Sequence, residues 1–154
     1  MTENEVSDQS DTIELLSFRV GGEDYAIDIG CTREIRGWTA PSSLPSAPDF
    51  ILGVINLRGD VVPLLDLAAR LGLSADGDND RNVIIVAKFQ ETMIGLVVDA
   101  VSDIIAPSER EMKSPPDITQ DGGVSYVQAL TFVDEKIIRI LDLASVLPPI
   151  HEAA

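Results

Sequence analysis

The residues best suited to chemistry are two aspartates, Asp66 and Asp142, each of which stands in the sequence Leu-Asp-Leu-Ala. Two carboxylates at matching positions of similar β halves are the arrangement of a hydrolase whose acids share one proton. That chemistry needs both carboxylates within hydrogen-bond reach on tight, glycine-containing turns, whereas helix-forming residues follow each aspartate here. We therefore expect Asp66 and Asp142 to cap helices and keep a paired-carboxylate hydrolase as a distant alternative.

The remaining side chains of catalytic type are one cysteine, Cys31, and one histidine, His151. A serine or cysteine nucleophile needs a base beside it, and the sequence offers no evident histidine for that role. The two residues are also too few for a zinc site of histidine and cysteine ligands. Neither glycine pair, Gly21-Gly22 or Gly122-Gly123, precedes the lysine and serine of a phosphate-binding loop. We therefore expect no enzyme activity, no metal ion and no cofactor.

The composition indicates a folded protein with an aliphatic core, since 45% of the 154 residues are hydrophobic and only 5% are aromatic. The net charge of −15 opposes binding to nucleic acid or to an anionic membrane, both of which attract clustered lysines and arginines. No apolar run reaches the roughly 20 residues that a membrane-spanning helix needs, and the first residues do not resemble a signal peptide. The sequence thus predicts a cytoplasmic protein with no nucleic-acid partner and no direct membrane insertion.

The most informative feature of the chain is an internal repeat. Residues 15–20 align with residues 84–89, a shift of 69 positions, and residues 61–68 align with residues 137–144, a shift of 76 positions. The seven added residues (76 − 69) fit an insertion in the loop at 115–123. Two halves with the same order of elements predict two similar modules around an approximate two-fold axis.

The repeat sets the expected domain boundaries. We expect a single folded domain at 14–147, with one half at 14–76 and the other at 82–147, and leave open an exchange of strands between the halves. Residues 1–13 carry four acidic residues and no basic one, which predicts a disordered acidic tail, and residues 148–154 form a C-terminal tail. Asp78-Asn79-Asp80 predicts a polar linker, because the spacing and terminal glutamate of a calcium-binding loop are absent.

Short β-branched runs separated by turn residues predict strands joined in hairpins. The expected hairpins join 15–20 to 24–29, 50–57 to 60–65, 82–89 to 92–98, and 126–133 to 136–141. Each half ends in a helical turn, at 66–71 and 142–147, and Gly72 suits the end of the first. No long crossover helix separates the hairpins, so the predicted fold class is all-β, a barrel or roll.

A candidate binding residue appears where the two halves differ. The tip Asn56-Leu57-Arg58-Gly59 aligns with Phe132-Val133-Asp134-Glu135, so an acid replaces Arg58 in the second half. Residues that both halves share are expected to serve the fold, whereas a residue found in one half is free to serve another purpose. An arginine at an exposed hairpin tip offers a planar group with several donors to a partner. An ordinary solvated arginine near Asp60 is the alternative.

Four segments resemble the CheW family of bacterial chemotaxis coupling proteins. They are Glu-Ile-Arg-Gly at 34–37, Phe-Ile-Leu-Gly-Val-Ile-Asn-Leu-Arg-Gly at 50–59, Val-Pro-Leu-Leu-Asp-Leu at 62–67, and Ile-Gly-Leu-Val-Val-Asp-Ala-Val-Ser-Asp at 94–103. The resemblance covers residues 15–147, nearly the whole chain beyond the tails. It implies two pseudo-symmetric five-stranded SH3-like barrels packed around a shared hydrophobic core, with a few short helices.

The resemblance also implies a function. CheW proteins are non-enzymatic adaptors that couple chemoreceptors, the methyl-accepting chemotaxis proteins, to the histidine kinase CheA in chemotaxis signal transduction. The implied partners are the cytoplasmic tip of the receptor and the regulatory domain of CheA, which recruit a cytoplasmic adaptor to membrane-associated receptor arrays. An adaptor of the same fold in a kinase pathway for pilus motility or development is the alternative.

The motif positions assign roles to individual residues. Receptor coupling falls on Arg58 and Glu34, although Asp103 is the counterpart of Glu34 in the second half and a local hydrogen bond stays open as part of its role. Thr32 stands where the family often has an aliphatic residue that touches the receptor tip. The receptor-binding set is completed by the residues that shape the hairpin, Asn56, Leu57 and Gly59. For the kinase surface we expect the apolar residues Trp38 and Leu44, with cover of the core as their alternative role.

Overall fold

The structure, a computed structural model, describes residues 13–73, 81–115 and 126–147. Residues 1–12, the Asp78-Asn79-Asp80 linker, the Gly122-Gly123 turn, His151 and the rest of the C-terminal tail lie outside the described residues. Within the described residues, strands dominate and the helices are short. The all-β prediction is therefore confirmed.

The elements follow one another in the same order in both halves of the chain. The strands are β1 (Leu15–Val20), β2 (Glu23–Asp28), β3 (Thr32–Gly37), β4 (Ile51–Leu57), β5 (Asp60–Asp66), β6 (Val83–Phe89), β7 (Thr92–Val98), β8 (Ala100–Ile105), β9 (Val127–Val133) and β10 (Lys136–Leu141). The helices are α2 (Leu67–Leu71), α3 (Leu143–Val146) and the 3-10 turns η1 (Ile29–Cys31) and η3 (Glu109–Glu111). Five strands followed by one short α-helix thus occur twice.

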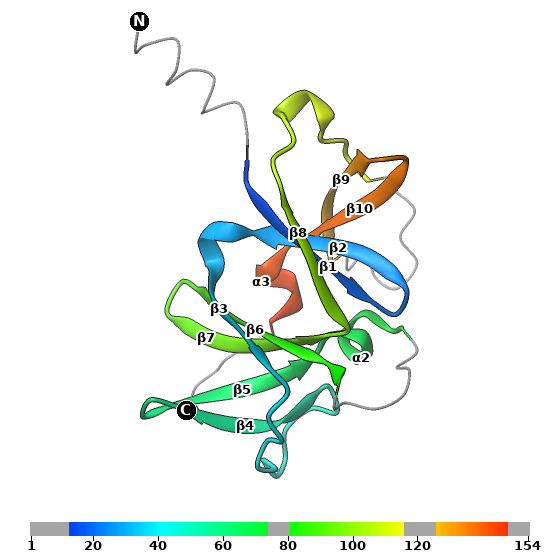
Figure 1. The fold of residues 1–154 in the computed structure, drawn as a ribbon. Helices are drawn as coiled ribbons and strands as arrows, with labels where there is room; N and C mark the ends of the chain where they lie inside the picture. The colour runs from blue at the N-terminus through cyan, green and yellow to red at the C-terminus, as the bar shows by residue number, and fades with distance from the viewer. Residues whose placement is uncertain (1–12, 74–80, 116–125, 148–154) are drawn as a thin grey trace, which may run out of the picture.

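The ten strands form two five-stranded sheets, which we call barrel 1 and barrel 2. Barrel 1 has the strand order β8-β1-β2-β10-β9, and barrel 2 has the order β3-β6-β7-β5-β4. Figure 1 shows barrel 1 above barrel 2, with α3 between them. Each barrel combines the first hairpin of one repeat with the last three strands of the other. The strands are therefore exchanged, and the boundary between the repeats is not the boundary between the barrels.

Strand register confirms that the repeat is structural. Ile55 pairs with Val62 in barrel 2, and their counterparts 76 positions later, Thr131 and Ile138, pair in barrel 1. The junctions of the exchange also match, since β5 pairs with β7 and β10 pairs with β2, both in parallel. Equivalent registers place equivalent residues at equivalent positions of the two barrels, so residues that differ between them can be compared directly.

Alternation along the strands produces three apolar clusters. In β1, Leu16, Phe18 and Val20 face a large cluster that lies between the barrels, whereas Leu15 faces a smaller cluster inside barrel 1. Barrel 2 encloses its own cluster, which includes Val62. Complete burial of one such side chain stabilises the folded state by about 1.5–3 kcal/mol. The shared cluster includes residues of both barrels and packs them against each other.

The two aspartates of the Leu-Asp-Leu-Ala sequences cap helices, as predicted. The Asp66 carboxylate accepts a hydrogen bond from the Ala69 amide at 3.3 Å at the start of α2, and the Asp142 carboxylate accepts one from the Ala144 amide at 3.2 Å at the start of α3. Gly72 ends α2 in the left-handed conformation with φ +78°. Each carboxylate thus satisfies an amide at its own helix terminus.

The hairpin pattern missed one strand in each half, β3 and β8. Both are edge strands, and their sequences, Thr-Arg-Glu-Ile-Arg-Gly and Ala-Val-Ser-Asp-Ile-Ile, lack a regular alternation of apolar and polar residues. Ile35 in β3 and Ile104 in β8 are apolar but exposed, so apolar residues in these strands do not mark the buried face alone. The five-stranded barrels expected from the family resemblance are therefore correct, whereas the count from hairpins alone is too low.

Candidate functional site

The candidate site is built on the β4–β5 hairpin of barrel 2. Arg58 and Gly59 form its two-residue turn with φ +49° and +93°, a combination of two positive values that matches the twist of paired strands. The Asn56 side chain accepts a hydrogen bond from the Gly59 amide at 2.9 Å. The turn is therefore held by its own residues, and the Arg58 side chain is 73% exposed.

Arg58 is bound to Glu34 on the edge strand β3. An Nη2 hydrogen of Arg58 is donated to Oε1 of Glu34 at 2.5 Å, and Arg36 donates from Nη1 to Oε2 of the same carboxylate at 3.1 Å. Glu34 is only 28% exposed. The sequence suggested Asp60 as the nearest acid, whereas the structure pairs Arg58 with a carboxylate 24 residues away. The ion pair bridges the edge strand β3 and the β4–β5 hairpin.

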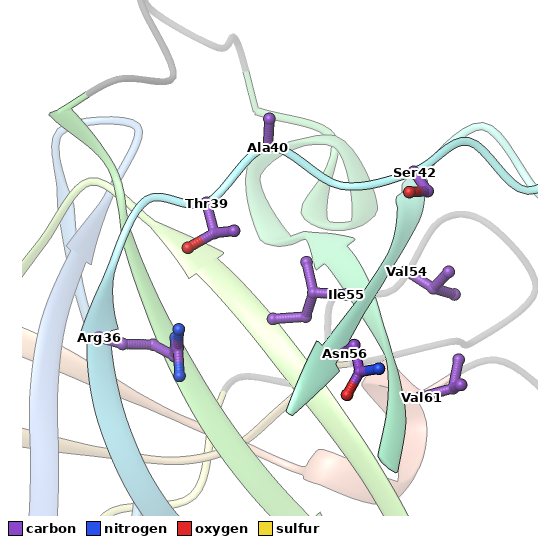
Figure 2. A pocket seen from close by; sticks show the side chains of 8 residues that line it. All are labelled: Arg36, Thr39, Ala40, Ser42, Val54, Ile55, Asn56 and Val61. Atoms are coloured by element: carbon purple, nitrogen blue, oxygen red, sulfur yellow. The ribbon is translucent and has the colours of Figure 1, made fainter. Parts of the chain in front are cut away.

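We use the word seam for the gap between the two edge strands of a barrel. The seam of barrel 2, between β3 and β4, contains a hollow of about 240 Å³. Figure 2 shows Arg36 and Thr39 on one side of it and Ile55 on β4 on the other. Its lining is completed by Ala40, Ser42, Val54, Asn56 and Val61.

The electrostatics of the seam favour the charged forms of its residues. Hydrogen bonds from Arg58 and then from Arg36 lower the pKa of the Glu34 carboxyl below its usual value. The Glu34 carboxylate in turn raises the pKa of Arg58. An arginine carries five N–H donors, so Arg58 keeps donors that point to solvent while its orientation is fixed by one bond to Glu34. Such an arrangement suits recognition of acceptor groups on another protein.

The other predicted site residues occupy different environments. Leu57 is 4% exposed and belongs to the apolar cluster of barrel 2, so it anchors the hairpin and offers no surface to a partner. Thr32 is partly buried on β3, and its Oγ1 atom has no hydrogen-bond partner. Trp38 packs against the barrel 2 cluster, whereas Leu44 is 46% exposed. The structure thus brings Arg58, Glu34, Asn56 and Gly59 together and leaves Leu44 on a separate loop.

Two residues of this region received no role from the sequence. Arg36 shares the Glu34 carboxylate with Arg58, and its position two residues after Glu34 on one strand was the available signal, because residues i and i+2 share a face. Val61 lines the hollow and is 69% exposed. Val61 stands in an apolar run at 61–65 that is typical of a buried strand, so the sequence did not indicate that its side chain is exposed.

Comparison with known proteins places the chain in a family. The model of the CheW-like domain matches residues 14–150. The chain belongs to the CheW family. A chemotaxis protein CheW of Rhizobium meliloti is 44% identical over 135 residues, which are 88% of this chain and 87% of the relative. A chemotaxis protein CheW of Klebsiella aerogenes is 33% identical, over 87% of this chain and 81% of the relative.

A solved CheW structure has the same fold as this chain. The crystal structure of the scaffolding protein TtCheW from Thermoanaerobacter tengcongensis superposes with a TM-score of 0.77 at 31% identity, covering 84% of this chain and 88% of that protein. The prediction of a CheW-family protein with paired SH3-like barrels is confirmed. In the described part of the chain, no helix has the length and apolar character needed to cross a membrane.

Proposed function

We propose that this chain is a non-catalytic adaptor that couples methyl-accepting chemotaxis receptors to the histidine kinase CheA. Membership of the CheW family supports this function. The observation that carries it is the Arg58 tip, where an exposed guanidinium is held in place by Glu34 on a hairpin anchored in a rigid barrel. An oriented charged group on a stiff support binds a partner without a large loss of side-chain entropy.

In this adaptor the receptor contacts the seam of barrel 2. Arg58 supplies hydrogen-bond donors to the cytoplasmic tip of the receptor, and Glu34 holds Arg58 in position. Asn56, Leu57 and Gly59 maintain the hairpin, and Thr32 lies on the same edge strand as Glu34. Exposed apolar surface at Val61 adds contact area. Of the two residues expected to contact the kinase, Trp38 and Leu44, Leu44 offers more exposed surface, because Trp38 is partly covered by the core. The adaptor works in the cytoplasm and is recruited to receptor arrays through these contacts.

Substitution of Arg58 by aspartate tests the receptor contact. We expect Arg58→Asp to lower the affinity for a purified receptor cytoplasmic tip by more than about tenfold, because it removes the donors and places a like charge beside Glu34. Titration calorimetry measures the affinity, and circular dichroism checks the fold. Arg110→Asp is the matched control, since it makes the same charge change at another exposed arginine and should stay within about twofold of the unchanged protein. Equal receptor binding by Arg58→Asp and the unchanged protein would refute the proposal.

A further inference from the structure

Barrel 1 has a seam at the position equivalent to the Arg58 site. Asp103 on β8 is in register with Ser17 of β1, as Glu34 on β3 is in register with Val86 of β6. Asp134 occupies the β9–β10 turn with φ +52°, close to the φ of +49° at Arg58 in the β4–β5 turn. The equivalent of the Glu34–Arg58 ion pair is thus a pair of aspartates.

Asp103 and Asp134 line one hollow of about 220 Å³ in the seam of barrel 1. Arg19, which also lines it, is held by Asp24 at 3.4 Å. The Asp103 carboxylate accepts a hydrogen bond from the neighbouring Ile104 amide at 2.8 Å. Among the residues that the structure describes, the observed salt bridges include neither Asp103 nor Asp134. Asp103 and Asp134 thus have no salt-bridge partner among the described residues, although Lys136 also lines the hollow.

The charges around the hollow favour a basic ligand. Asp103 and Asp134 contribute two negative charges, Glu135 adds a third at the exposed tip, and Lys136 on the lining contributes one positive charge. Within the described residues, no group of three or more histidine, cysteine, aspartate or glutamate side chains is placed to hold a metal ion. The excess of negative charge around this hollow favours a guanidinium or ammonium group from another protein.

Exposed apolar side chains lie on the strands next to the residues that line the acidic hollow. Phe132 and Ile137 lie directly opposite each other on β9 and β10 and are 56% and 41% exposed. Ile104, beside Asp103, is 55% exposed. Three large exposed side chains around one hairpin and its neighbouring edge strand are typical of a protein-binding surface. At the equivalent of Phe132, barrel 2 has the polar residue Asn56, which caps the Arg58 turn instead.

We propose that the barrel 1 seam docks the second partner of the adaptor, the kinase, through an arginine or lysine that enters between Asp103 and Asp134 with apolar residues on either side. The partner's cation takes the place that Arg58 of this chain has in barrel 2, and its apolar residues cover Phe132, Ile137 and Ile104. This inference rests on the proposed adaptor function. The two seams belong to different barrels, so each can hold a different partner.

A second copy of this chain is a poorer occupant than a basic segment of another protein. Each copy has a net charge of −15, so two copies repel each other. The most exposed arginine at a hairpin tip, Arg58, is already bound to Glu34 of its own chain. Insertion of that arginine into the barrel 1 seam of another copy would cost this bond.

The decisive variant, Asp134→Arg, places a cation of this chain at the position where the partner's cation is proposed to bind. In Asp134→Arg, the turn conformation at position 134 directs an arginine toward Asp103, as it directs Arg58 toward Glu34 in barrel 2. We expect the variant to fold with at least the thermal stability of the unchanged protein, and to lose about tenfold or more in affinity for the purified regulatory domain of the kinase. Affinity for the receptor tip should stay within about twofold. Kinase affinity of the unchanged protein should also fall with added salt.

Glu91→Arg is the matched control, because it makes the same charge change at an exposed acid on the β6–β7 turn of barrel 2. It should leave kinase affinity unchanged. Asp134→Asn gives a second variant without steric bulk and should cause a smaller loss than Asp134→Arg.

The inference is overturned if Asp134→Arg binds the kinase domain as the unchanged protein does. It is equally overturned if sedimentation shows that the barrel 1 seam joins copies of this chain. No binding of the kinase domain by the unchanged protein would overturn the proposed function together with this inference, so the two failures are distinguishable.

Discussion

The β4–β5 and β9–β10 hairpins have the same register, positive φ at both residues of their turns and opposite charges at their tips. Their inward residues, such as Val62 and Ile138, are buried in both barrels. Their outward residues differ, with Arg58 bound to Glu34 in one barrel, whereas Asp134 and Asp103 line one hollow in the other. The common residues maintain the fold, and the differing residues distinguish the two surfaces.

The comparison extends to the segments that cross each outer strand. Ser42 forms a bridge with Val54 on β4, and Lys113 forms the equivalent bridge with Leu130 on β9. Beneath the first crossing lies Gly53, with φ +148° and the Ser42 carbonyl in close contact. Its counterpart in the second half is Ala129. The barrels therefore share the crossing but tolerate different side chains beneath it.

The largest loss of stability that would test this comparison is expected from a substitution at Gly53. A Cβ atom in Gly53→Ala would overlap the carbonyl oxygen of Ser42 and would also require a backbone conformation that favours glycine. We expect a loss of about 3 kcal/mol in the free energy of unfolding, measured by urea denaturation. The crossing segment carries the loop with Leu44, so the variant should also expose that loop to proteolysis.

Ala129→Gly, at the equivalent position of barrel 1, is the control. It should cost only about 1 kcal/mol or less, the usual penalty of glycine within a strand. A loss below about 1 kcal/mol for Gly53→Ala would show that the crossing segment moves aside freely.

A second asymmetry lies at the junction of the two repeats. Arg70 of α2 donates from Nε to the Val146 carbonyl at 2.7 Å and from Nη2 to the Ser145 carbonyl at 3.3 Å, at the end of α3. Its guanidinium also lies 4.3 Å and 5.2 Å from the ring centres of Phe50 and Tyr126, which are 76 positions apart. One arginine thus joins equivalent aromatic residues of both repeats, although its own counterpart, Val146, is apolar.

We expect Arg70→Met to lower the free energy of unfolding by about 2 kcal/mol, because it leaves two helix carbonyls without their donors and removes both ring contacts. Thermal and urea denaturation measure this loss. Arg70→Lys should recover part of it, since an ammonium group keeps the charge but cannot reach both carbonyls with a planar fork. Equal stability of Arg70→Met and the unchanged protein would mean that water replaces the guanidinium without cost.

Much of the fold could be predicted because its signals are local. Hairpins follow from β-branched runs around turn residues, and the helix caps follow from Asp66, Asp142 and Gly72. The exchange of strands could not be chosen from the sequence, because the contacts that decide it, such as Leu64 with Gly95, join residues from different halves. Edge strands β3 and β8 were missed because they have two partly exposed sides and no regular alternation.

The candidate site was predicted residue by residue but not as a unit. Arg58 emerged from the break in the repeat, and Glu34 from the family motif. Their ion pair depends on the position of β3 at the seam of barrel 2, which only the three-dimensional arrangement gives. Recognition of the acidic seam of barrel 1 required both the repeat and the structure. Asp103 and Asp134 are 31 positions apart in the sequence (134 − 103) and come together only in the lining of the hollow.

The smallest predicted effect concerns the titration of Glu34. Its pKa is lowered chiefly by the hydrogen bond from Arg58, so Arg58→Met should move the pKa of Glu34 up toward its usual value, while the remaining bond from Arg36 keeps it somewhat low. Because the folded-state pKa is below the unfolded-state value, the ion pair stabilises the protein above the unfolded-state pKa. This contribution is lost as the pH falls through the folded-state pKa.

Carbon-detected NMR of the Glu34 carboxyl, recorded from neutral to acidic pH, measures this shift in both proteins. Arg110→Met is the control and should leave the titration of Glu34 unchanged. An identical Glu34 titration in Arg58→Met and the unchanged protein would mean that Arg36 alone sets the pKa. Arg58 would then not depend on Glu34 for its orientation. The contrast between the two seams, one with an internal ion pair and one proposed to bind a partner's cation, would lose its physical basis.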